Sequence, residues 1–183
     1  MEIKEIDKNN TDTLEQLKAM LVYAFPHAYA DCADEEVETL ISDDRILLGA
    51  FDNDMLLGFI GAIPQYDLTG WELHPIIVKK EQRYLGIGTA LLKALEDTIA
   101  KKGGITIYLG TDDEFYKTSL SNTDLYEDLY DKIKNIKNIG KHPYEFYEKN
   151  GYKITGVIPD ANGLGKPDII MAKRIRKLQD ENK

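Results

Sequence analysis

The chain has 183 residues, a formal net charge of −9, and 43% hydrophobic and 30% charged residues. This length is enough for one full hydrophobic core and requires no second core, so we expect a single domain over residues 1–183. The acidic balance argues against binding to the phosphate backbone of a nucleic acid, and it either favours a cationic partner or serves solubility alone.

The sequence offers little for membranes or metals. Residues 1–8 are charged and lack the apolar core of a signal peptide, and the longest apolar run, 55–64, is about half a membrane span. The single cysteine, Cys32, excludes an intrachain disulfide and a multi-cysteine zinc site, and three scattered histidines lack metal-ligand spacing. We therefore expect a cytoplasmic protein that binds no metal and no membrane.

Predicted strands and helices alternate along the chain, with no internal repeat and no linker between them. Apolar runs bounded by turn residues predict strands at 2–7, 45–51, 55–66, 71–78, 105–109, 152–158 and 168–175. Helical spacing and capping residues predict helices at 11–26, 34–41, 89–102, 124–134 and 143–150. The polar stretch 112–123 is a predicted functional or variable loop. This pattern favours an α/β or α+β fold in one domain.

A glycine loop joins the strand 71–78 to the helix that follows it, with the sequence Arg83-Tyr84-Leu85-Gly86-Ile87-Gly88-Thr89. Unpaired N–H groups at a helix N-terminus attract anions, and glycines let the backbone approach a phosphate closely. The dinucleotide fingerprint needs a third glycine where Leu91 stands, and the Gly-Lys-Ser/Thr of nucleotide triphosphatases is absent. The loop indicates either another phosphate-bearing ligand or only a tight turn into a helix.

Pro75 interrupts the strand before this loop. Proline donates no ladder hydrogen bond and favours a bulge or an edge, so we expect the N–H of Ile76 to be available to polarise a carbonyl group. Glu72 and His74 alternate with Leu73 and should point to one face. Either could hold a cationic substrate or accept its proton, and the alternative is that both are ordinary solvated strand residues.

Three features together resemble the GCN5-related N-acetyltransferase superfamily: the Arg83-x-x-Gly86-x-Gly88 motif, the bulge-prone strand before it, and the segment from Glu145 to Tyr152. The resemblance implies the single-domain fold of that superfamily, with a mixed, mostly antiparallel central sheet that is splayed in the middle and flanked by helices. It implies acetyl-CoA as co-substrate, with its pyrophosphate on the 83–89 loop.

The same resemblance implies roles for individual residues. Ile76 and Val78 would lie beside the cofactor's pantetheine arm, and the Ile76 N–H would stabilise the oxyanion of the reaction. Tyr147 would protonate the departing thiolate, for which a phenol that is neutral at pH 7 is suited.

A narrower resemblance runs through 58–66, 69–75, 103–113 and 142–152, which are similar to aminoglycoside 6'-N-acetyltransferases of the chromosomal enterococcal type. It implies acetyl transfer to the 6'-amine of aminoglycosides, antibiotic resistance, a homodimer, and Glu72 as the catalytic carboxylate that positions the substrate. The predicted substrate contacts are Tyr66, Trp71, Glu72 and His74. Asp112 and Asp113, at the end of a central strand, are candidate contacts for the other amines of the substrate, and the alternative is a solvated turn. Residues 25–34 and 79–85 depart from that pattern, which could alter specificity.

The expected mechanism is direct attack of the amine on acetyl-CoA in a ternary complex, with no acylated residue. Two alternatives stay open. One is an acetyltransferase for another cationic amine, such as a polyamine, a peptide N-terminus or a lysine. The other is a non-enzymatic sensor of acetyl-CoA, against which the presence of both Glu72 and Tyr147 argues.

Overall fold

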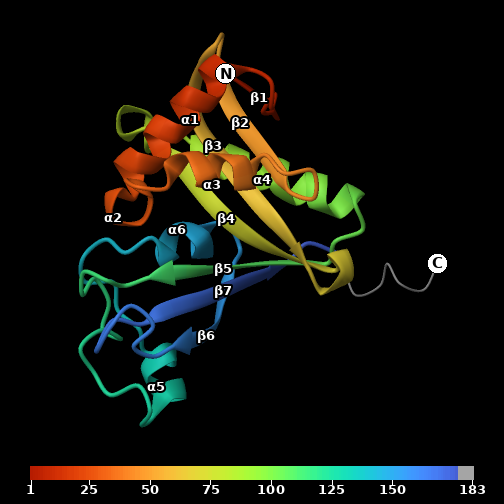
Figure 1. Ribbon diagram of the computed structural model, residues 1–183. Coiled ribbons are helices and arrows are strands. Elements are labelled where there is room, and N and C mark those ends of the chain that lie inside the picture. Colours follow the sequence, from red (N-terminus) through yellow and green to blue (C-terminus); the bar gives the residue numbers. More distant parts are fainter. Residues whose placement is uncertain (177–183) are drawn as a thin grey trace, which may run out of the picture. The chain divides into compact units, whose positions relative to one another are not determined.

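The computed structural model describes residues 1–176, which form two compact units (Figure 1). Unit 1 is Met1–Ile105 and unit 2 begins at Thr106. The elements of unit 1 are β1 (Glu2–Glu5), α1 (Thr11–Ala24), α2 (Pro26–Tyr29), α3 (Ala33–Leu40), β2 (Ile46–Asp52), β3 (Met55–Gln65), the 3-10 turn η1 (Tyr66–Leu68), β4 (Gly70–Val78), the 3-10 turn η2 (Lys80–Gln82) and α4 (Ile87–Lys101). Those of unit 2 are β5 (Thr106–Asp112), α5 (Leu129–Lys134), α6 (Tyr144–Lys149), β6 (Lys153–Ile158) and β7 (Asp168–Arg174).

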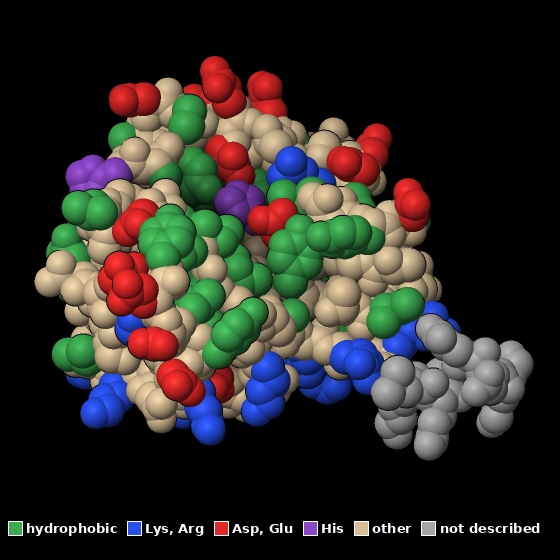
Figure 2. Space-filling model, turned by 90° about the horizontal axis from the view of Figure 1, so that it is seen from below, with side chains coloured by type: hydrophobic (Ala, Val, Ile, Leu, Met, Phe, Trp, Pro, Cys, Tyr) green, Lys and Arg blue, Asp and Glu red, His purple; other side chains and the backbone are tan. Residues whose placement is uncertain are grey.

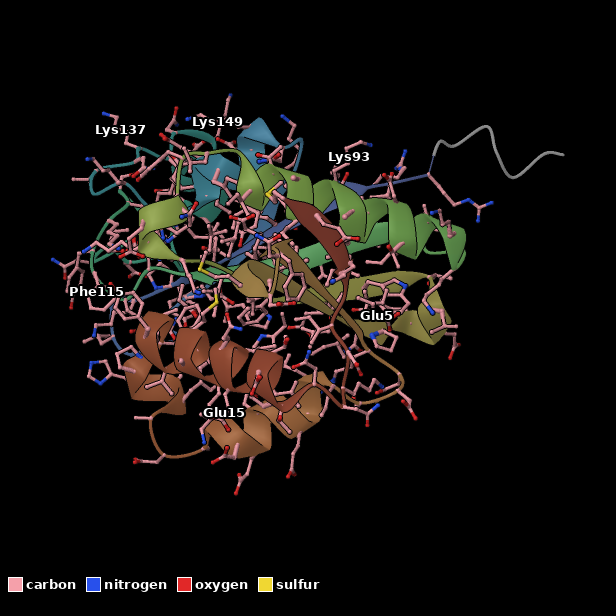
Figure 3. All side chains as sticks on the ribbon, turned by 90° about the horizontal axis from the view of Figure 1, so that it is seen from above. Glu5, Glu15, Lys93, Phe115, Lys137 and Lys149 are labelled. Atoms are coloured by element: carbon pink, nitrogen blue, oxygen red, sulfur yellow. The ribbon has the colours of Figure 1, made fainter. Side chains whose placement is uncertain are left out.

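Unit 1 has an antiparallel sheet in the order β1-β2-β3-β4, with helices on both faces. Helices α1 to α3 cover one face and α4 covers the other, and Glu15 of α1 and Lys93 of α4 point away from the sheet on opposite sides (Figure 3). The apolar stripe of α4 consists of Ile87, Leu91, Leu92, Leu95 and Ile99, all buried. Burial of this stripe against the sheet stabilises unit 1.

The core on the other face of the unit 1 sheet joins helices α1 and α3 to the strands. It contains Leu17 and Leu21 of α1, Val37 and Leu40 of α3, and Phe59 of β3, with several further apolar residues. Asn10 caps α1 by accepting a hydrogen bond from the Thr13 N–H at 3.0 Å. Helices α1 and α3 are therefore anchored to strand β3 and its neighbours.

Unit 2 has a smaller antiparallel sheet in the order β5-β7-β6. The helix predicted at 124–134 is shorter than expected, because α5 begins only at Leu129. The Asp124 carboxylate instead accepts a hydrogen bond from the Tyr126 N–H at 2.9 Å, and Asp128 is in the left-handed region with a φ of 50°. An Asx turn therefore replaces the first half of the predicted helix.

The predicted α+β class with flanking helices is confirmed by these strands and helices. The expected splay in the middle of the sheet would lie between the two units, and it stays a prediction. A single domain over residues 1–183 also stays a prediction, since two compact units are found. Acidic side chains are frequent on the face drawn in Figure 2, in keeping with the net charge of −9.

Candidate functional site

Strand β4 contains a bulge at Pro75. The pairing of β3 with β4 shifts register between Ile60 and Ala62, so that His74 and Pro75 both lie opposite Gly61. The His74–Pro75 peptide bond is cis. Two residues opposite one define a β-bulge, which bends and twists the strand locally. The bulge that the sequence predicted from Pro75 is confirmed.

The bulge reverses the alternation of side chains along β4. Before it, Glu72 and His74 are half-buried and share a face, as predicted, and the contacts of His74 come from α2 and α3. After the bulge, Val78 lies on the other face, because Val78 and Leu91 of α4 both lie next to Gly58 of β3. Ile76 shares that face with Val78. One strand thus presents polar side chains to the α2–α3 side and apolar side chains to the α4 side.

The backbone of β4 also has a defined direction after the bulge. Lys79 N donates to Leu57 O at 2.9 Å, which makes this pair a hydrogen-bonded pair of the ladder. Hydrogen-bonded and non-hydrogen-bonded pairs alternate in antiparallel sheets, so Ile76 and Val78 belong to the second kind. The Ile76 N–H therefore points away from β3. The Val78 carbonyl points the same way, and it accepts a hydrogen bond from Arg83 Nε at 3.2 Å.

The glycine loop enters α4 with two residues in the left-handed region, Tyr84 at a φ of 65° and Gly86 at 84°. Gly86 is the N-cap, and among the described residues no side chain caps the helix and no acidic residue stands in its first turn. A Cβ on Gly86 would meet no atom within 4 Å, so glycine is needed there for its φ rather than for space. Uncapped N–H groups and open surroundings suit an anion.

Other loop residues leave the surface around this helix start accessible. Arg83, Tyr84, Leu85 and Thr89 are exposed, and Tyr84 is 99% exposed, whereas Ile87, the first residue of α4, is buried. Gly88 lies in the first turn. The guanidinium of Arg83 is held by the Val78 carbonyl, so its positive charge is fixed next to the loop.

Tyr147 lies in unit 2, on the six-residue helix α6. The helix ends in a Schellman motif, because Tyr152 N donates to Tyr147 O at 3.0 Å, Gly151 N donates to Glu148 O at 2.9 Å, and Gly151 has a φ of 90°. The Tyr147 side chain is 7% exposed, and burial raises the pKa of its phenol well above the ordinary value. The phenol is therefore a neutral donor at physiological pH.

His142 fixes the start of α6. Its Nδ1 accepts a hydrogen bond from Tyr144 N at 3.2 Å, and its Nε2 lies 3.1 Å from the Asp112 carbonyl oxygen. Asn138 bonds the backbone of His142 on both its N–H and its carbonyl. Only the neutral ring with its proton on Nε2 satisfies both ring contacts. Burial lowers the pKa of His142, which favours this neutral form.

The two aspartates predicted to contact substrate differ in their surroundings. Asp113 is fully buried, and its carboxylate accepts hydrogen bonds from Lys117 N at 2.6 Å, Thr118 N at 2.8 Å and the Ser121 hydroxyl. Burial opposes its ionisation, but these hydrogen bonds outweigh burial and lower the pKa of Asp113. Asp113 thus holds its own loop. Asp112 is exposed, and one of its oxygens accepts a hydrogen bond from Asn162.

Tyr66 and Trp71 flank the start of β4 in different settings. Tyr66 is 74% exposed and stands in the turn η1. Trp71 is buried beside Gly104, and its indole N–H donates to the Leu68 carbonyl at 3.0 Å. This differs from the expectation that Trp71 contacts substrate, because its side chain lies on the face of β4 opposite Glu72 and stabilises the turn.

The structure also assigns residues to the site that the sequence did not indicate. Tyr29 and Glu36 surround His74 from α2 and α3. They stand 45 and 38 positions away from it, as the numbering shows, and neither belongs to a motif. The weak signal in the sequence was that Glu36 stands four positions before Leu40, which places both residues on one face of the predicted helix.

Metal and membrane features can be assessed for residues 1–176. In this part of the chain no three His, Cys, Asp or Glu side chains are grouped as metal ligands would be. No helix in the same range has the length and apolar character needed to cross a bilayer.

Comparisons with known proteins add the family. The sequence profile of the acetyltransferase (GNAT) family matches residues 13–128. The chain belongs to this family. No curated protein sequence gave a significant match.

Among solved structures, an aminoglycoside 6'-N-acetyltransferase complexed with coenzyme A is 54% identical, with a TM-score of 0.97 over 98% of this chain and 100% of that one. The aminoglycoside 6'-N-acetyltransferase from Enterococcus faecium is 53% identical, with a TM-score of 0.94 over 98% and 100%. An aminoglycoside 6'-acetyltransferase of type Ii is 47% identical, with a TM-score of 0.79 over 97% and 99%. This GNAT chain is thus similar along its length to aminoglycoside-modifying enzymes.

Proposed function

We propose that the chain is an aminoglycoside 6'-N-acetyltransferase that moves the acetyl group of acetyl-CoA directly to the 6'-amine. The observation that carries the proposal is the bulge of β4, which puts Glu72 and His74 on one face and Ile76 and Val78 on the other. A cationic acceptor and an acyl donor can therefore meet at one strand. The sequence identity of 53–54% to two such enzymes supports this acceptor.

The loop residues that would hold acetyl-CoA are Arg83, Tyr84, Leu85, Gly86, Ile87, Gly88 and Thr89. The uncapped start of α4 and its fixed guanidinium suit the pyrophosphate. Ile76 and Val78 would line the path of the pantetheine arm. The Ile76 N–H, which points away from β3, would donate to the thioester carbonyl and to the oxyanion that it becomes.

The acceptor would be held by Glu72, with His74, Tyr66 and Asp112 as further contacts. Acidic and polar side chains suit a polycation, whereas Asp113 and Trp71 are left out because both are buried in other roles. Glu72 would accept the proton of the attacking amine through water. The amine would attack the thioester carbonyl carbon and form the C–N bond; collapse of the resulting oxyanion would then break the C–S bond, and the sulfur would take a proton from the neutral phenol of Tyr147. Exchange with solvent restores both groups, and no residue is acylated.

The test is coenzyme A release with a matched pair of acceptors. Neomycin carries a 6'-amine where paromomycin carries a 6'-hydroxyl, so we expect release with neomycin well above that with paromomycin. Equal release would contradict transfer to the 6' position. Release only with spermidine or a lysine peptide would reassign the acceptor, and cofactor binding without release in any arm would identify a sensor.

Two substitutions test the assigned roles. We expect Tyr147→Phe to lower kcat by about 10²-fold without weakening cofactor binding, because only the proton donor is removed. Glu72→Ala should mainly weaken acceptor binding. The controls are Tyr130→Phe and Glu15→Ala, which change exposed residues outside the site. Unchanged turnover in both test variants would contradict the mechanism.

We also propose a cytoplasmic homodimer that confers aminoglycoside resistance. These points rest on the sequence resemblance. Light scattering after gel filtration measures the oligomeric state, and the growth of a susceptible strain that expresses the chain measures resistance.

A further inference from the structure

His74 is surrounded by side chains of the two helices that cover its face of the sheet. Its Nε2 lies 3.4 Å from Glu36 Oε1 and 3.3 Å from the Tyr29 hydroxyl oxygen. Glu36 is on α3, whose residues Val37 and Leu40 are buried in the core of unit 1. The carboxylate is therefore delivered to the imidazole by a helix that is fixed on the sheet.

The geometry around Glu36 restricts where the His74 proton can be. Glu36 Oε1 is closed to solvent and has no other hydrogen-bond partner within residues 1–176, and His74 Nε2 lies 3.4 Å from it. If Nε2 carried a lone pair, a buried anionic oxygen would face it without a donor, which is costly. If Nε2 carries the proton, Glu36 and Tyr29 both offer acceptor oxygens.

We propose that Glu36 is a positioning residue of the acceptor site: it holds His74 in the tautomer with the proton on Nε2 and thereby leaves Nδ1 as an acceptor for an ammonium substrate. The inference rests on the proposed function, since it concerns the site in which Glu72 would hold the amine. His74 remains 38% exposed and Glu36 18%, so the ring is open to a ligand while the carboxylate is mostly covered. A carboxylate that orients an imidazole in this way is a common arrangement in active sites.

Tyr29 is the competing influence on His74. Burial raises the pKa of Tyr29, and electrostatic interaction with Glu36 and Cys32 raises this pKa further, so the Tyr29 hydroxyl remains protonated. A Tyr29 hydroxyl that donated to Nε2 would place the ring proton on Nδ1 instead. The two arrangements predict opposite tautomers, and they can be separated by experiment.

The decisive measurement is the tautomer of His74 in the intact chain, read from the ¹⁵N shifts of its imidazole and assigned with His74→Gln. We expect the neutral ring to carry its proton on Nε2. Glu36→Gln should lower the ratio of the Nε2–H to the Nδ1–H form by about tenfold, because a charged acceptor is lost. His142, whose Nδ1 accepts a hydrogen bond from backbone, supplies an internal reference for the Nε2–H form.

The matched control is Glu38→Gln, which removes one negative charge from an exposed position of the same helix. It should leave the tautomer ratio of His74 unchanged. Tyr29→Phe should also leave the Nε2–H form dominant. An Nδ1–H form in the unaltered protein, or an unchanged ratio in Glu36→Gln, would overturn the proposal.

Kinetics then connect the tautomer to the reaction. Glu36→Gln should lower kcat/KM for neomycin about tenfold while the KM for acetyl-CoA stays constant, and Glu38→Gln should match the unaltered enzyme. An unaltered kcat/KM in Glu36→Gln would refute the positioning role. If the unaltered protein transferred no acetyl group, the proposed function would fail, whereas the tautomer of His74 would still be decided by the NMR experiment.

Discussion

Gly61→Ala is expected to destabilise the chain and to impair the acceptor side of the site. Gly61 lies opposite the bulge, and a Cβ there would overlap the carbonyl oxygen of His74, which is backbone and cannot rotate away. Overpacking of this kind costs about 1–3 kcal/mol. Replacement of glycine by alanine regains about 0.4–1 kcal/mol from the unfolded chain. The net expectation is a loss of roughly 1–2 kcal/mol.

The matched control is Gly156→Ala. Gly156 also stands in a strand next to a register shift, but a Cβ there would meet no atom within 4 Å. This variant should be as stable as the unaltered protein or slightly more so. Urea unfolding followed by circular dichroism measures both, and the kcat/KM for the acceptor is measured alongside. Equal stability of Gly61→Ala and Gly156→Ala would refute the account of the bulge.

Three further predictions concern the termini of helices and the loops. Burial lowers the pKa of His142 in the folded protein. The neutral ring therefore stabilises the fold fully above about pH 6.5, and this stabilisation is lost as the pH falls through the folded-state pKa. The corresponding slope of the unfolding free energy against pH should vanish in His142→Gln and persist in the exposed His27→Gln. Asp113→Asn should cost about 1–3 kcal/mol in urea unfolding, because backbone donors lose a buried charged acceptor. Gly86→Ala should weaken acetyl-CoA binding in calorimetry, whereas Gly103→Ala, with an equally strained φ at the other end of α4, should not.

The sequence predicted those parts of the site that depend on local chemistry. The bulge follows from Pro75, because proline lacks the ladder donor, and the start of α4 follows from Gly86, although the helix begins at Ile87 rather than at residue 89. The shared face of Glu72 and His74 follows from strand periodicity alone.

What the sequence did not predict depends on contacts between distant segments. The pattern of β4 cannot show that Ile76 turns to the face opposite His74, because this requires the pairing with Gly61. The approach of Glu36 to His74 depends on how α3 packs on the sheet. Asp113 looked like a candidate ligand contact because nothing local reveals that its loop folds back over it.

The extra residue at the Pro75 bulge determines which side chains of β4 share a face. All four accessible side chains of the strand, Glu72, His74, Ile76 and Val78, have even numbers, and in a regular strand they would form one continuous row. Because of the bulge, Ile76 and Val78 instead lie on the face opposite Glu72 and His74. Pairing of the same residues without the bulge would put both halves on one face, because side chains alternate strictly in a regular strand. The extra residue opposite Gly61 therefore keeps the polar half and the apolar half of β4 on opposite faces.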